Sequence, residues 1–61
     1  MEDLEYFVRL KTYLENYFGT AMCNGNPMAV IELEEAKAAE DIETLEELAR
    51  RACIDYNKFK Q

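Results

Sequence analysis

The side chains of this chain that could perform chemistry are its carboxylates and its two thiols. Glu32 and Glu35 are three residues apart and Glu43 and Glu47 are four apart, so each pair would share one face of a helix. Helical di-iron proteins combine such glutamates with histidine in Glu-x-x-His motifs, but the chain has no histidine. It also lacks the closely spaced oxygen ligands around a glycine turn that calcium requires. We therefore expect a solvated acidic face, with no metal ion and no other cofactor.

The thiols belong to Cys23 and Cys53. Neither has a histidine partner or a C-x-x-C spacing that would activate it, and the chain contains no serine. The usual general base and nucleophiles of enzymes are therefore missing, so we do not expect an enzyme. Each cysteine is expected to be a small buried apolar residue; the alternatives are one disulfide between them or a reactive thiol.

The amino-terminal residues and the length of the apolar runs bear on localisation. Three of the first five residues are acidic, whereas a signal peptide is positively charged and then apolar. No apolar run approaches the ~20 residues needed to span a bilayer. We expect a cytoplasmic protein that does not associate with membranes, in which the thiols stay reduced.

Negative charge is concentrated in the middle of the chain. The 61 residues include 13 acids and 7 bases, a formal net charge of -6. Residues 32–47 contain eight acids and one base, Lys37, so this segment carries -7 and the rest of the chain sums to +1. A nucleic-acid binder normally presents a basic patch to the phosphates. We therefore expect no binding to nucleic acid.

A junction between two helices is predicted at residues 24–27. Gly25 suits the left-handed position that ends a helix, Asn26 suits the N-cap of the next helix, and Pro27 suits its first turn. The second helix is expected over residues 27–38, with an alanine-rich end that has little to anchor it.

The first helix is predicted over residues 3–18, with Gly19 as its left-handed cap. Continuation to Asn24 is the alternative, at a cost of ~1 kcal/mol for a glycine inside the helix. Apolar residues cover much more of this helix than the arc of just over 100° that is typical of a surface helix.

These apolar and aromatic residues form the expected interface, because tyrosine is enriched at protein interfaces and a domain of this size buries only about 60% of its surface. The interface residues are Tyr6, Phe7, Leu10, Tyr13, Leu14, Tyr17 and Phe18. A homodimer or higher oligomer would cover them. The alternative is an intramolecular core with solvated tyrosine edges.

A third helix is predicted over residues 45–53. Thr44 with Glu47 three residues later is a capping box, and apolar residues then recur at helical spacing. After this helix, either Asp55 caps a short turn over residues 56–60, or the helix continues so that Tyr56 and Phe59 extend its apolar face.

This last segment is similar to the first half of a helix-turn-helix unit of the repressor type. The matching residues are Thr44, Leu45, Leu48, Ala49, Ala52, Ile54 and Asp55. Cys53 stands where that family has its turn glycine. The resemblance implies a helix pair whose second helix reads DNA, but the residues before it are nearly all acidic.

Together these patterns predict a single all-α domain over residues 1–61, a small three-helix hairpin or bundle that is completed by oligomerisation. We expect an acidic module that binds another protein chain, with its own copy as the first candidate. The alternative is an accessory of a DNA-binding regulatory system, either a degenerate helix-turn-helix module or an acidic decoy of a basic surface.

Overall fold

The computed structural model describes the backbone of residues 2–60 and the side chains of residues 4–60. It contains three α-helices, α1 (Glu2–Cys23), α2 (Pro27–Ala38) and α3 (Ile42–Arg51), and a 3₁₀ helix, η1 (Tyr56–Lys60). Within this part of the chain there is no strand. The predicted class, a small all-α protein with three helices, is confirmed.

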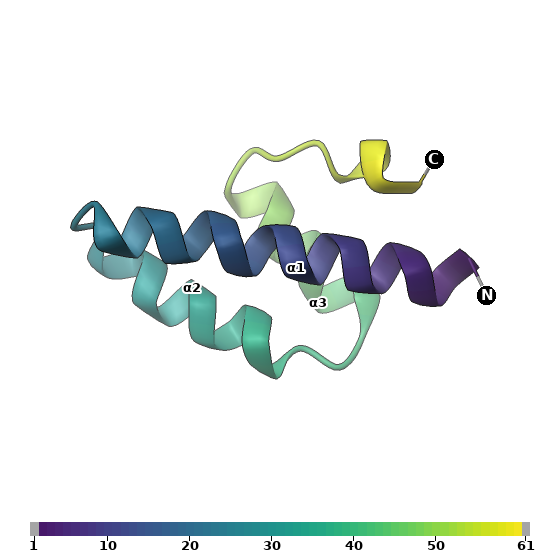
Figure 1. Cartoon of the computed structure of the whole chain (residues 1–61), viewed down its shortest axis with the longest axis horizontal. Helices are drawn as coiled ribbons and strands as arrows, with labels where there is room; N and C mark the ends of the chain where they lie inside the picture. The colour runs from purple at the N-terminus through teal and green to yellow at the C-terminus, as the bar shows by residue number, and fades with distance from the viewer. Residues whose placement is uncertain (1, 61) are drawn as a thin grey trace.

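Helix α1 is the central element of the molecule. It runs along the long axis of a body measuring 36 × 20 × 15 Å, and each of the other elements contacts it (Figure 1). After the junction α2 folds back along α1, α3 packs on another side of α1, and η1 returns along α1 toward its amino-terminal end (Figure 1).

The core lies where these elements meet. Its buried residues come from all three α-helices and the α2–α3 connection: Leu10, Leu14, Phe18, Ala29, Leu33, Ala36, Ala39, Leu45, Leu48 and Ala49. The contribution of α2 is mostly alanine, and small side chains allow close approach between helix backbones. The small residues of α2 thus let it pack closely against the leucines and Phe18 of α1.

The first helix is longer than predicted. It continues through Gly19 to Cys23, so the predicted end at Phe18 is wrong. Phe18 is buried and Ala21 packs against the core, which favours keeping this last turn helical. The end is set instead by Gly25, whose φ of 92° lies in the left-handed region.

The hydrogen bonds after α1 form a Schellman motif. The Asn26 N–H donates to the Ala21 carbonyl at 3.1 Å, and the Gly25 N–H donates to the Met22 carbonyl at 3.0 Å. Asn26 then caps α2, because its side-chain oxygen accepts from the Met28 N–H at 3.1 Å. The predicted roles of Gly25 and Asn26 are confirmed, and α2 has the predicted bounds.

The two glycines are expected to respond in opposite ways to replacement by alanine. Gly25→Ala should destabilise the protein by about 1 kcal/mol, since an alanine at positive φ is strained. Gly19→Ala should stabilise it by about 0.5–1 kcal/mol, since Gly19 lies inside α1 and an added Cβ meets nothing within 4 Å. Urea unfolding followed by circular dichroism measures both, and shifts of the same sign would contradict this structure of the junction.

Removal of the N-cap of α2 is a separate test of the junction. Asn26→Ala should cost about 1 kcal/mol, because the Met28 N–H loses its acceptor. Asn26→Asp is the matched control, since a carboxylate caps equally well. An unchanged urea midpoint for Asn26→Ala would contradict the role of this cap.

Helix α3 begins earlier than predicted. Asp41 is its N-cap, accepting from the Thr44 N–H at 3.0 Å, and the helix starts at Ile42. The prediction that Thr44 is the cap is therefore wrong. The earlier start gives Ile42 a place against the core. Hydrogen bonds from Thr44, through its hydroxyl and its backbone N–H, lower the pKa of the Asp41 carboxyl.

A second Schellman motif ends α3. The Ile54 N–H donates to the Ala49 carbonyl at 2.8 Å and the Cys53 N–H to the Arg50 carbonyl at 3.0 Å. Asp55 then accepts from the Asn57 N–H at 3.1 Å, at the start of η1. Of the two predicted endings the short turn is confirmed, and the continuous helix is wrong.

Cys53 occupies the glycine position of this motif, with a φ of 60°. Cys23 is the last residue of α1, and both cysteines are exposed and unbridged. The prediction that they are buried is therefore wrong, since each lies at a helix end and not on a packed face.

Replacing Cys53 by glycine is expected to stabilise the protein by about 0.5–1 kcal/mol. Glycine removes the steric cost of a Cβ in the left-handed region, and this gain exceeds the extra chain entropy that glycine brings to the unfolded state. Cys53→Ala is the control for the loss of the thiol and should leave stability nearly unchanged. A lower thermal midpoint for Cys53→Gly would contradict the prediction.

The carboxyl end of α2 is closed by a side chain from another helix. Lys11 of α1 donates from Nζ to the carbonyl oxygens of Ala36, Lys37 and Ala39, at 3.0, 2.9 and 3.1 Å. Carbonyls at a helix end lack the i+4 N–H partner of interior residues, and here the Ala36 carbonyl also accepts from the N–H of the C-cap Ala39 at 3.4 Å. An ammonium group also complements the negative end of the helix dipole. The alanine-rich end of α2 is thus anchored from α1.

Candidate functional site

The structure uses most of the predicted interface inside one chain. Leu10, Leu14 and Phe18 are buried in the core of the single chain, as in the alternative of an intramolecular core; contact of this helix with a second copy stays a prediction. The chain's own α2, α3 and η1 contact α1 and cover these residues. Tyr6, Phe7 and Tyr13 are half-buried against the same core, and only Tyr17 is largely exposed.

Helix η1 packs on the aromatic residues of α1. The rings of Tyr13 and Phe59 have centroids 5.0 Å apart, and Lys58 Nζ lies 5.3 Å from the centre of the Tyr13 ring. Lys60 Nζ lies 5.6 Å from the ring centres of both Tyr6 and Tyr56. Cation–π contacts of this kind contribute about 0.5–1 kcal/mol each at exposed sites. Helix η1 thereby covers part of the aromatic surface of α1 that was predicted to contact a second chain.

Tyr6 links α1 to α3 by a hydrogen bond. Its hydroxyl donates to Glu46 Oε2 at 2.8 Å. Burial, this hydrogen bond and the negative charge of Glu46 together raise the pKa of Tyr6 far above its ordinary value. The hydroxyl is therefore neutral at physiological pH and acts as a fixed donor between the two helices.

Large apolar side chains are exposed on two helices. On α1 they are spread along its length, at Leu4, Val8, Tyr17 and Met22, and on α2 three of them lie within four residues. Met28, Val30 and Ile31 of α2 are 60%, 43% and 56% exposed. On the opposite side of the same helix, Ala29 and Leu33 are buried against α1. We call the exposed residues Met28, Val30, Ile31, Glu34 and Glu35 the α2 outer face.

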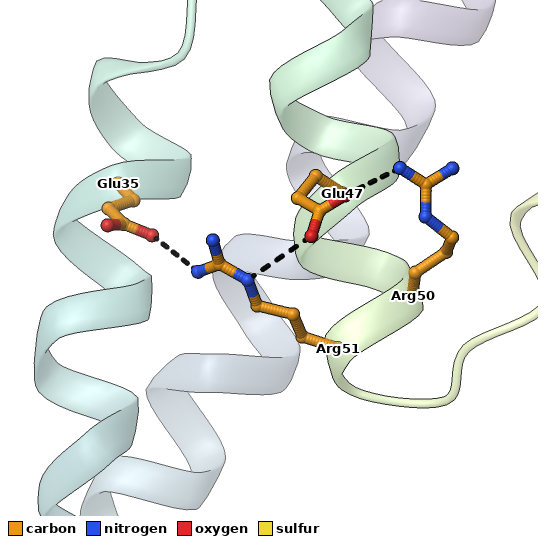
Figure 2. Close-up of polar contacts among 4 residues, drawn as sticks. All are labelled: Glu35, Glu47, Arg50 and Arg51. Carbon is orange, nitrogen blue, oxygen red and sulfur yellow. Dashed lines mark hydrogen bonds and ion pairs between the residues drawn. The ribbon is translucent and has the colours of Figure 1, made fainter.

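An acidic groove lies between this helix and α3. It has a volume of about 430 Å³ and is lined by Glu35, Asp41, Glu43, Thr44, Glu47, Leu48 and Arg51. Arg51 crosses it: its Nη1 lies 3.4 Å from Glu35 Oε1 of α2, and its Nε lies 3.5 Å from Glu47 Oε2 of α3 (Figure 2). Glu35 therefore belongs to both the α2 outer face and the groove.

The charges of the groove are not balanced. Four carboxylates line it and one guanidinium lies in it. A second arginine, Arg50, approaches Glu47 from outside the groove (Figure 2). Its hydrogen bond and charge, with a smaller effect of Arg51, lower the pKa of Glu47. With four carboxylates and one guanidinium, the groove is an electronegative surface.

Among residues 4–60, no three acidic or cysteine side chains come together to hold a metal ion. Of the predicted carboxylate pairs, Glu43 and Glu47 both line the groove, whereas Glu35 lines it and its predicted partner Glu32 is half-buried and is not among the lining residues. Glu35 and Glu47 lie on either side of Arg51. Within the described residues, no helix has the length and apolarity needed to cross a membrane.

The α2 outer face was not predicted from the sequence. The signal was present, since four of the six residues from Met28 to Leu33 are large and apolar, and they point to different sides of a helix. A helix that is apolar all round is normally buried all round. The aromatic residues of the first helix were a more evident signal than these apolar residues of the second helix.

Comparison with known proteins places the chain in no family. No family model, no curated protein and no solved structure matches it.

Proposed function

We propose that the protein is a small acidic helical module that binds another protein chain through the α2 outer face. The observation that carries this proposal is that the first half of α2 has large apolar side chains on more than one side, whereas only the side of Ala29 and Leu33 is buried. Burying an exposed Met, Val or Ile side chain contributes about 1.5–3 kcal/mol. A partner that covers Met28 and Ile31 would therefore gain a substantial part of its binding energy there.

The exposed residues also suit a protein partner by their type. Methionine is flexible and polarizable, and it is common at surfaces that accommodate a partner helix. The neighbouring Glu34 and Glu35 provide a polar rim beside the apolar residues, as in ordinary interfaces.

Site-specific photocrosslinking tests the proposal on the full chain. A benzoyl-phenylalanine at position 31 should crosslink to a protein chain in the cells that produce the protein. The same group at position 16, an exposed polar site on α1, is the control and should give little product. Equal labelling from both positions, or none from position 31, would contradict a binding role for the α2 outer face.

The same experiment addresses self-association, which the sequence predicted. With Leu10, Leu14 and Phe18 in the core, two copies would have to meet through other residues, and the α2 outer face offers three exposed apolar side chains, Met28, Val30 and Ile31. A product of twice the chain mass would identify a second copy as the partner. Sedimentation equilibrium over an about 100-fold range of concentration then measures the dimer, which Ile31→Gln should weaken.

The alternative role in a DNA-binding system leads to a separate prediction, that the protein does not bind duplex DNA. The four bases of the segment that resembles a helix-turn-helix unit already have partners: Arg50 and Arg51 lie against Glu47, while Lys58 and Lys60 lie over tyrosine rings. Fluorescence anisotropy with a mixed-sequence duplex at about 50 mM salt should give a Kd weaker than the ~10⁻⁴ to 10⁻⁶ M of non-specific binders. A micromolar or tighter constant would favour the helix-turn-helix alternative.

A further inference from the structure

We propose that the partner of the α2 outer face is a basic amphipathic helix. This inference rests on the proposed function, because it names the occupant of the same surface. It is carried by the way in which apolar and acidic residues are arranged along α2 and into the groove.

Apolar and acidic residues follow one another along one side of α2. Met28, Ile31 and Glu35 are three and then four residues apart, so they lie in one row on the helix. All three are exposed, and Glu35 opens into the groove beside α3. A helix laid along this row would meet apolar side chains at one end and carboxylates at the other.

The carboxylates at that end already hold a cation of the kind proposed. The Arg51 guanidinium lies between Glu35 and Glu47, which shows that the groove accommodates an arginine side chain. Glu34 and Glu43 are exposed, and none of the ion pairs among residues 4–60 includes them. They remain available to cationic side chains from a partner.

The negative charge of this region favours a basic partner over an acidic one. Residues 32–51 contain eight acids and three bases, a balance of -5. A second copy would bring the same negative charge to within the Debye length, ~8–10 Å at ordinary salt. A helix with one apolar face and flanking Lys or Arg would instead gain attraction at every position where its cations meet these acids.

A pair of synthetic peptides tests the inference on the full-length protein. The first is an amphipathic leucine/lysine helix of about 18 residues, which spans ~27 Å and exceeds the length of α2. The second has the same leucine positions with every lysine replaced by glutamate. Binding of each is measured by fluorescence anisotropy at two salt concentrations.

Three variants of the protein locate the binding. Ile31→Gln keeps a good helix former at an exposed position and should weaken the leucine/lysine peptide by about 10-fold or more. Glu34→Gln should weaken it by about 2- to 5-fold. Glu5→Gln is the matched control and should have no effect, because it removes one exposed charge near the amino-terminal end of α1, outside the α2 outer face and the groove. Circular dichroism confirms that each variant is folded.

The outcomes separate this inference from the proposed function. Binding of the leucine/lysine peptide alone, weakened by salt and by Ile31→Gln, supports it. Equal Ile31-dependent binding of both peptides overturns the basic partner but leaves the α2 outer face as a protein-binding surface. Binding that Ile31→Gln does not weaken, or no binding of either peptide, overturns the inference. A crosslinked homodimer from position 31 also overturns it, because it identifies a second copy as the occupant.

Discussion

Replacement of Leu14 by alanine is expected to unfold most of the protein at 25 °C. Leu14 is fully buried at the centre of α1, and Leu→Ala at such sites costs about 2–5 kcal/mol through lost burial and a residual cavity. A chain of 61 residues has a small core, and such cores rarely supply more than about 3–5 kcal/mol of net stability. The expected loss is therefore comparable to the whole free energy of unfolding.

Circular dichroism at 222 nm and a urea titration measure this effect. Val8→Ala is the matched control on the same helix, since Val8 is 51% exposed and alanine has the higher helix propensity. It should change the free energy of unfolding by less than about 0.5 kcal/mol. If Leu14→Ala keeps the wild-type urea midpoint, Leu14 is not a core residue of this chain.

The prediction also separates the two explanations of the aromatic helix. If the residues of α1 formed an interface between copies, the effect of Leu14→Ala would depend on protein concentration, because dissociation and unfolding would be linked. With Leu14 inside one chain, the loss of stability should be the same at all concentrations.

The sequence predicted the elements better than it predicted their partners. Gly25, Asn26 and Pro27 identify the α1–α2 junction, because each residue type has a local backbone preference that tertiary contacts do not reverse. The apolar face of α1 was also correctly recognised. What covers that face depends on the return of η1 along α1 (Figure 1), and no local pattern encodes a contact over such a distance.

The two misplaced helix ends have a similar explanation. Asp41 and Thr44 are both good N-caps, and the choice of Asp41 lets Ile42 pack on the core. Gly19 is a plausible helix end by itself, but the buried contact of Phe18 and the stronger stop at Gly25 keep α1 helical. In each case packing decided between two locally acceptable signals.

The surface was the least predictable part of the molecule. Clustered acids between residues 32 and 47 indicated an electronegative region, but not that Arg51 would span Glu35 and Glu47 (Figure 2). That arrangement depends on α2 and α3 lying side by side. The exposure of Met28 and Ile31 likewise depends on which side of α2 meets α1.

Replacement of Lys11 is expected to cause the second large loss of stability. The Lys11 Nζ donates to three carbonyl oxygens at the end of α2 and lies 5.8 Å from the centre of the Phe7 ring. A hydrogen bond from a charged group contributes about 1.5–3 kcal/mol. Because the three acceptors share one ammonium group, we expect Lys11→Met to cost a total of about 2–3 kcal/mol, while methionine keeps the apolar contacts of the lysine stem.

In Lys11→Met the loss of stability should appear first at the carboxyl end of α2 and only then in the whole protein. Hydrogen exchange should accelerate first in the last turn of α2, because the carbonyls of Ala36, Lys37 and the C-cap Ala39 lose the Lys11 ammonium as a donor. Exchange in the first turn of α2, capped by Asn26, should change less. Lys37→Met is the control, since Lys37 is exposed on the same turn and its side chain makes none of these bonds. A Lys11→Met variant with the urea midpoint of the Lys37→Met control would show that water replaces the ammonium at no cost, and that α2 is held by its core contacts alone.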